Sequence, residues 1–228
     1  MQIKRYRLLL IALFPLTALF SSCFQLIEEV SVNADGSGFF TLTANMSQSR
    51  TKLASILLLD SINGYKVPSK QEIGEKMNEA ANTLRTVDGI GNVSQSVDFD
   101  KYIVTIRFAF NDVSNLNDIT ALIFDKLDIV EGTDNSSYNF QPGSGTFSRQ
   151  YTHDARATSE YQKMKQADKA IFENATYTCI YRFAQPIASQ SNTTAKVAAS
   201  RKAVMLQCNV LDLIGGHTDI SNTIQLAQ

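Results

Sequence analysis

The chain has few of the residues from which catalytic and metal sites are usually built. Its 228 residues include no tryptophan, two histidines, three cysteines and four prolines. So few histidines and cysteines leave no paired spacing for a zinc site, and we expect no dedicated metal or cofactor. The formal net charge is only −1 at pH 7. Because binding to a polyanion needs clustered positive charge, no nucleic-acid partner is expected.

One long apolar run is present, and it stands near the start of the chain. A basic segment, 4–7, precedes the run 8–20, which is thirteen residues long. This run is too short to span a bilayer as a helix, which needs about 20 apolar residues. A basic start before a short apolar run is typical of a secretory signal. We therefore expect residues 1–22 to be a signal peptide and residues 23–228 to form one domain.

The four residues at the end of the run, Phe20-Ser21-Ser22-Cys23, resemble the lipobox of bacterial lipoproteins in the looser form of the Bacteroidota. The resemblance implies cleavage before Cys23 and lipidation of this residue, which would then anchor the chain in a membrane. The alternative is an ordinary secretory signal cut near Ser22, which leaves Cys23 as a free thiol. In proteobacterial lipoproteins, an aspartate directly after the cysteine retains the protein in the inner membrane. Phe24 stands at this position here, so the expected location is the periplasmic face of the outer membrane.

Two alternating segments predict a β-hairpin directly after Cys23. Apolar and polar residues alternate in 26–32 and 39–46, although Glu28 interrupts the first pattern. Asp35-Gly36 between them is a strong hairpin signal, because glycine adopts positive φ without a Cβ clash.

Helical spacing of apolar residues then predicts helices in 47–60 and from Ser69 onward to Gly89. The second helix opens with a capping box, in which Ser69 and Glu72 satisfy each other's backbone N–H groups. A third helix is expected to open at Ser114 and to carry apolar residues as far as position 127.

A second hairpin is expected between these helices, with a turn at Asp100-Lys101 and a half-buried strand at 102–110. The order ββ-α-ββ-α predicts an α+β fold, in which helices pack on one face of a mostly antiparallel sheet built from hairpins.

The segment 131–154 is polar and rich in turn residues, and we interpret it as a loop. Ser144 lies there between two glycines, but the G-x-S-x-G spacing of a nucleophile elbow is absent. His153 falls in the same segment and His217 in another polar stretch, so both are interpreted as solvated loop residues.

The C-terminal part is predicted to contain a helix at 159–173, core strands at Thr176–Phe183 and 204–210, a short helical turn, and a closing edge strand at 220–226. Cys179 and Cys208 lie on the apolar faces of the two core strands. Two outcomes stay open for them: a disulfide in an oxidising periplasm, or two buried free thiols.

Three features together resemble uncharacterised lipoproteins of the Bacteroidota and, more distantly, LppM-type envelope lipoproteins. They are the lipobox, the hairpin segment 29–38 and the C-terminal segment 177–183 with 211–213. The resemblance implies an envelope location and an α+β fold, and it assigns no catalytic residues. In addition, Asp60-Ser61-Ile62 is similar to the acceptor of periplasmic O-glycosylation in the Bacteroidota, which makes Ser61 a candidate for modification; the alternative is a polar helix end.

Two function classes remain. The first, which we favour, is a non-catalytic envelope lipoprotein that is held at the membrane by its lipid anchor and binds an envelope protein, a glycan or an amphiphile. The second is an envelope hydrolase that uses carboxylates, for which Asp98 and Asp100 in the second hairpin are candidates. Turn chemistry explains these aspartates without catalysis, and no nucleophile, base and oxyanion donors occur together.

Overall fold

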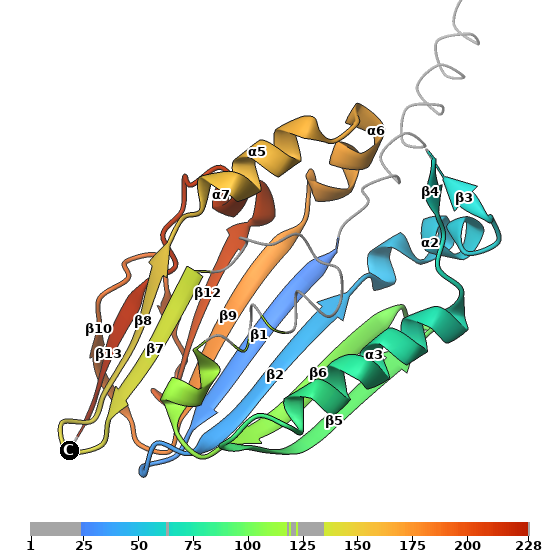
Figure 1. The fold of residues 1–228 in the computed structure, drawn as a ribbon. Helices are drawn as coiled ribbons and strands as arrows, with labels where there is room; N and C mark the ends of the chain where they lie inside the picture. The colour runs from blue at the N-terminus through green and yellow to red at the C-terminus, as the bar shows by residue number, and fades with distance from the viewer. Residues whose placement is uncertain (1–23, 63, 118, 120–121, 123–134, 228) are drawn as a thin grey trace, which may run out of the picture.

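The computed structural model describes residues 24–62, 64–117, 119, 122 and 135–227 (Figure 1). Two large β-sheets dominate it. In spatial order, the seven strands of the larger sheet are β11 (Lys196–Val197), β12 (Ala203–Asn209), β9 (Thr176–Phe183), β1 (Gln25–Val32), β2 (Gly38–Asn45), β6 (Ile103–Phe110) and β5 (Ile90–Asp98). The four strands of the smaller sheet are β10 (Ile187–Gln190), β13 (Asn222–Leu226), β8 (Thr146–Thr152) and β7 (Asn135–Gln141). A two-stranded ribbon joins β3 (Ser61–Ile62) to β4 (Tyr65–Lys66).

The helices described are short, with one exception. They are η2 (Ser47–Ser49), α2 (Arg50–Ile56), α3 (Lys70–Leu84), η3 (Val113–Leu116), α5 (Ala155–Lys163), α6 (Gln166–Lys169), η4 (Ala170–Phe172) and α7 (Val210–Ile214). Within the described residues, no helix combines the length and the apolar character needed to cross a bilayer. The expected α+β class with mostly antiparallel sheets is confirmed.

Strand β1 occupies the centre of the larger sheet. It pairs antiparallel with β2, as the hairpin signal predicts, and Gly36 in the turn has φ +88°. On its other side β1 runs parallel to β9, with Gln25 opposite Thr176 and Val32 opposite Phe183. The chain therefore returns after about 150 residues to cover the free edge of its first strand. The other pairs in the larger sheet are antiparallel.

One face of the larger sheet, which we call the inner face, carries the core. Val30, Phe40, Leu42, Ile106 and Phe108 point from this face into one contiguous cluster of buried apolar residues. Alternation along each strand places these residues on the same side, because successive side chains of a strand point to opposite faces.

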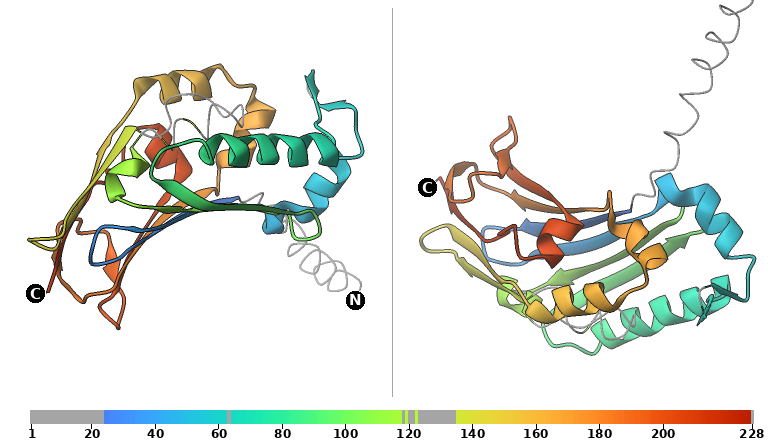
Figure 2. Two further views of the ribbon diagram at one scale, coloured as in Figure 1. Left: turned by 60° about the horizontal axis from the view of Figure 1, so that its bottom comes forward. Right: turned by 90° about the horizontal axis from the view of Figure 1, so that it is seen from above.

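Two layers share the inner face (Figure 2). The smaller sheet covers the part around β9, where the Phe147 ring lies 5.0 Å from Tyr181 and 5.5 Å from Phe183, centroid to centroid. Helix α3 covers the β5 end and buries Met77, Ala80, Ala81 and Leu84. The expected capping box of α3 is confirmed: Ser69 Oγ accepts the Glu72 N–H at 3.1 Å, and Glu72 accepts the Ser69 N–H at 2.7 Å.

The interpretation of 131–154 as a loop is wrong, because this segment contains the hairpin β7–β8. Tyr138, Phe147 and Arg149 are buried against the larger sheet, while the polar residues between them face outward. A strand that packs against the core with a single face needs few apolar residues. Its composition therefore resembles that of a loop.

Two further predictions need correction. The helix expected from Ser114 is, where described, only the 3₁₀ turn η3, and the backbone is already extended at Asn117 (φ −64°, ψ 133°); most of its remaining length lies outside the described residues. The segment expected as a closing edge strand is β13, which lies inside the smaller sheet between β10 and β8.

Two glycines on opposite sides of the core make a matched test of this packing. A Cβ on Gly38 would lie 1.9 Å from the Ser31 carbonyl oxygen and 2.6 Å from the Phe110 ring, whereas a Cβ on Gly74 in α3 would meet nothing within 4 Å. We expect Gly38→Ala to lower the free energy of unfolding by about 3 kcal/mol or more, since backbone must move. Gly74→Ala should raise it by about 0.5–1 kcal/mol, because alanine favours the helix. Urea unfolding of both variants checks the pair, and equal effects would contradict the described packing.

Candidate functional site

The most unusual chemistry of the molecule is an ion pair sealed between the two sheets. Glu28 of β1 is 1% exposed and Arg149 of β8 is 0% exposed. Arg149 Nη1 lies 3.3 Å from Glu28 Oε1. Both residues are in phase with the apolar side chains of their strands, so alternation points them into the space between the sheets.

Tyrosine hydroxyls complete the surroundings of the Glu28 carboxylate. Tyr138 of β7 donates to Oε1 at 2.8 Å, and Tyr177 of β9 donates to Oε2 at 2.5 Å. Each carboxylate oxygen is therefore hydrogen-bonded, which a buried carboxylate requires because it has lost its water.

The guanidinium of Arg149 is satisfied by the same strands. Its N–H groups donate to Ser136 Oγ at 2.8 Å, and to the hydroxyls of Tyr177 and Tyr181 at 3.0 Å each. Burial opposes the charge, but Glu28 and the surrounding tyrosines raise the pKa of Arg149 well above its usual value. Arg149 thus stays charged and ties β8 and β7 to β1 and β9.

Cys179 lies against this pair but is not a nucleophile. Arg149 Nη1 is 2.9 Å from Cys179 Sγ. A nearby cation favours a thiolate, yet burial is the larger effect and raises the pKa of Cys179 to about 12. The reactive form of cysteine is the thiolate, so this thiol is inert at neutral pH.

Of the two outcomes left open for Cys179 and Cys208, the structure has the free thiols. Cys179 lies opposite Leu206, and Cys208 lies opposite Tyr177. The two cysteines are thus a diagonal pair, and diagonal pairs lie about 7–8 Å apart, beyond the span of a typical disulfide. Burial and the neighbouring Asp212 raise the pKa of Cys208 to about 11.

The remaining predicted modification sites are placed differently. Cys23 lies outside the described residues. Ser61 is exposed in strand β3, five residues beyond the end of α2, so it is not the polar helix end considered as the alternative.

The aspartates considered for a hydrolase serve the turn of the second hairpin. Asp98 Oδ1 accepts the backbone N–H groups of Lys101 at 2.8 Å and Asp100 at 3.0 Å. The hydrogen bond from Lys101 is the main cause that lowers the pKa of Asp98 below its usual value. A carboxylate held in this way stays ionised and closes the turn, as turn chemistry predicts.

The two histidines flank one turn between α7 and β13. The His153 ring packs against Gly216, and the His217 ring packs against Gly215. His153 Nε2 lies 3.2 Å from Thr158 Oγ1, which itself donates to the Ile214 carbonyl at 2.6 Å. His153 therefore donates through Nε2; it lies in the loop between β8 and α5, half-buried against the turn that it supports, whereas His217 is exposed.

A polar cleft of about 500 Å³ opens beside this turn. Each of its lining residues carries a hydroxyl, amide, carboxylate or imidazole; they are Gln150, 191–194, 217–219 and 221–223. Its wall is organised by Asn222, whose Oδ1 accepts the N–H groups of Ser191 and Asn192 at 3.1 Å each. Asp219 is the single carboxylate among the lining residues, which gives the cleft no pair for acid–base hydrolysis.

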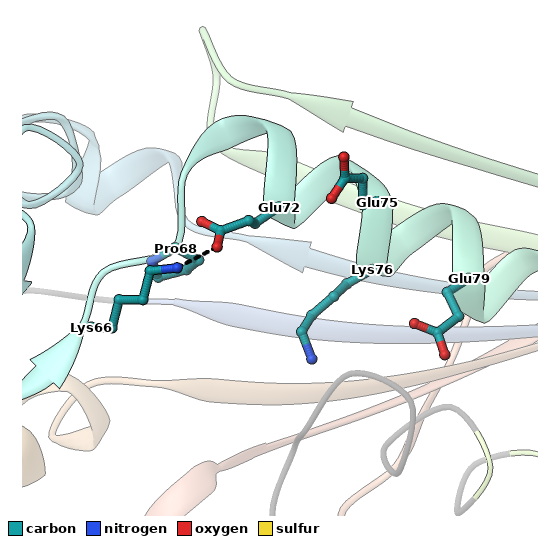
Figure 3. A pocket seen from close by; sticks show the side chains of 6 residues that line it. All are labelled: Lys66, Pro68, Glu72, Glu75, Lys76 and Glu79. Carbon is teal, nitrogen blue, oxygen red and sulfur yellow. Dashed lines mark hydrogen bonds and ion pairs between the residues drawn. The ribbon is translucent and has the colours of Figure 1, made fainter.

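A second cavity, of about 370 Å³, lies along α3 (Figure 3). Glu72, Glu75, Lys76 and Glu79 line it, with Lys66 paired to Glu72 at its mouth. The hydrogen bonds from Lys66 and Ser69 lower the pKa of Glu72 to about 2. This groove is a charged helix face, and among the described residues no three histidine, cysteine or acidic side chains converge to hold a metal ion.

Removing one partner of the buried ion pair should be far more costly than removing its surface counterpart. We expect Arg149→Met to lower the free energy of unfolding by about 3–5 kcal/mol, because the Glu28 carboxylate is left buried without its counter-charge. Arg182→Met is the control on neighbouring strands: Arg182 Nε lies 3.1 Å from Glu29 Oε1 with both side chains partly exposed, so its loss should stay below about 1 kcal/mol. The double variant Glu28→Gln/Arg149→Met should be more stable than Arg149→Met. Urea unfolding measures all three, and a double variant that is no more stable than Arg149→Met would contradict coupling between Glu28 and Arg149.

The thiols give an independent check on burial. We expect a maleimide at pH 8 to label Cys208 slowly and Cys179 more slowly still in the folded protein, because both thiols have raised pKa values. Both should react at once in denaturant without prior reduction, as read by mass spectrometry. Cys208→Ala should remove the first label only. A mass change on reduction would instead reveal a disulfide.

The comparisons with known proteins give little further guidance. No protein-family model matches the chain. A search of curated proteins found no match either. Among solved structures, the chain is similar to the folded domain of the LppM protein of Mycobacterium tuberculosis, determined by NMR: the two are 12% identical, the TM-score is 0.44, and the match covers 89% of this chain and 88% of that one. The expected distant similarity to LppM is thus present as a structural likeness, which is too weak to carry an argument about a site.

Proposed function

We propose that this protein is a lipid-anchored lipoprotein of the cell envelope, and that its folded part is a non-catalytic binding or structural module on the periplasmic face of the outer membrane. The observation that carries the proposal is the position of β1. This strand begins at Gln25, two residues after the candidate lipid site Cys23, and it is the central strand of the larger sheet.

The start of β1 is fixed in place, so an anchor at Cys23 would hold the domain by its core. The Thr176 N–H donates to the Phe24 carbonyl at 3.0 Å, and the Phe24 ring packs edge-on against Phe172 with centroids 5.7 Å apart. Two extended residues span about 7 Å. A lipid on Cys23 would therefore keep this end of the sheet directly at the membrane surface.

The non-catalytic part of the proposal is supported by how the reactive groups of the described residues are used. Glu28 and Arg149 are sealed in the core. Asp98 closes a turn, and His153 supports another. A general acid or base must reach a substrate, and these groups are committed to the fold instead.

The polar cleft beside β13 supports a hydrophilic partner. Its lining of hydroxyl and amide groups suits the hydroxyls of a glycan or the backbone of an extended peptide, whereas an amphiphile needs a predominantly apolar site. Pull-down from solubilised envelopes is the assay that would name this partner.

Lipidation is the step on which the proposal stands. We expect cells grown with an alkyne fatty acid to label the wild-type protein and not Cys23→Ala, because the acyl chains attach at this residue. Cys208→Ala is the matched control and should keep the label, since Cys208 lies in the folded core. In-gel detection after coupling a fluorophore measures the label.

Label retained in Cys23→Ala would refute the anchor. The non-catalytic part fails separately, if a turnover found in the purified protein disappears on Asp98→Asn or His153→Ala while the fold stays intact.

A further inference from the structure

The exposed apolar side chains of the described residues are unevenly distributed. Seven large ones are exposed, and five of them come from the segments 58–65 and 170–172; these five are Leu58 (87% exposed), Leu59, Ile62, Tyr65 (62% exposed) and Ile171. Single exposed apolar residues are normal on a protein surface, but a group of them marks a contact site.

The two segments belong to one surface. Lys165, at the start of α6, places its Nζ 5.4 Å from the centre of the Tyr65 ring in β4. From Lys165 the chain continues through α6 directly to Ile171 in η4. Figure 1 shows α2, the β3–β4 ribbon and α6 at the same end of the molecule.

The chain enters the fold at this same end. Phe24 packs on Phe172, the neighbour of Ile171, and Phe172 packs in turn on Tyr161 with ring centroids 5.7 Å apart. Strand register confirms the end: Gln25 lies level with Asn45, Ile103 and Asn209 through the paired strands. Phe24, the residue that follows the candidate lipid site, therefore lies at the end of the fold that carries the exposed apolar group.

Two lysine–tyrosine contacts lie beside the group. Lys169 Nζ lies 5.4 Å from the centre of the Tyr161 ring, and Lys165 covers Tyr65 in the same manner. Lysine stems lie along apolar surface while the ammonium stays in water, and tyrosine rings favour the headgroup level of a bilayer. This composition is typical of a surface that rests in the membrane interface.

We propose that this surface, made of Leu58, Leu59, Ile62, Tyr65 and Ile171, is a membrane-docking surface that inserts into the interfacial layer of the bilayer beside the acyl chains of Cys23. The proposal rests on the proposed lipid anchor. A tether of two residues holds this end at the bilayer, so lipid, rather than another protein, is the partner that the surface meets. The domain then stands with its strand ends on the membrane, and the opposite end with the C-terminus points away from it.

Because the chain contains no tryptophan, one introduced indole reports on one position. The test uses Leu58→Trp and, as the control, Val197→Trp, which is also exposed but pairs with Val204 at the opposite end of the sheet. Each acylated protein is reconstituted in vesicles of phosphatidylethanolamine and phosphatidylglycerol, with lipids brominated just below the headgroup.

We expect about a twofold loss of emission and a blue shift for Leu58→Trp in brominated vesicles, since interfacial groups insert by about 5–10 Å. Val197→Trp should be unaffected. Equal quenching of both variants, or quenching of neither, would overturn the docking surface.

The two proposals can fail separately. A fatty-acid label on Cys23 without selective quenching of Leu58→Trp refutes the docking surface and leaves the anchor. If Cys23 carries no label, the surface is tested by sedimenting the purified chain with the same vesicles: binding that falls in Leu58→Ser/Ile62→Ser supports it, and absence of binding overturns it. A glycan found on Ser61, between Leu59 and Ile62, would also overturn it, because a bulky sugar keeps this segment out of lipid.

Discussion

The buried ion pair between Glu28 and Arg149 is the constraint on which the rest of the structure depends. Two charges removed from water cost several kcal/mol each, and this cost is offset only when every oxygen and N–H group finds a partner. Here the partners come from four strands in two sheets: Glu28 from β1, Arg149 from β8, Tyr138 from β7, and Tyr177 and Tyr181 from β9. The sheets can therefore pack in only one relative position without stranding a charge.

The same constraint fixes strand register. A slip of two residues in β1 would keep Glu28 on the inner face but move it about 7 Å along the strand, so Arg149 would lose its nearest carboxylate. Apolar packing alone tolerates small shifts, because one aliphatic contact can replace another. A charged network with fixed directions does not. This pair contributes specificity of packing more than net stability, which fits its place at the centre of both sheets.

Local signals in the sequence predicted the elements they act on. Asp35-Gly36 and the Ser69–Glu72 box act within a few residues, and both the hairpin turn and the helix cap are present as expected. The β7–β8 hairpin was missed because one face of it is polar. Glu28 interrupts the apolar alternation of its strand, although it lies in phase with Val30 and Val32, as Arg149 does with Phe147. The signal that could have indicated the ion pair is one acidic and one basic residue, each in phase with the apolar residues of its own strand. The parallel pairing of β1 with β9 has no local signal, because it joins residues far apart in the chain.

The parallel pairing of β1 with β9 also limits how early the chain can reach its native structure. Glu28 and Arg149 are separated by 121 residues, and the edge of β1 stays open until β9 has been delivered. Contacts of such separation form slowly, because the entropy of closing the loop is lost before the contact gains anything. A nascent chain would thus keep its first hairpin solvated, with an uncompensated glutamate on the side destined for the core. Such a polypeptide completes its larger sheet only after the segment that forms β9 has been synthesised.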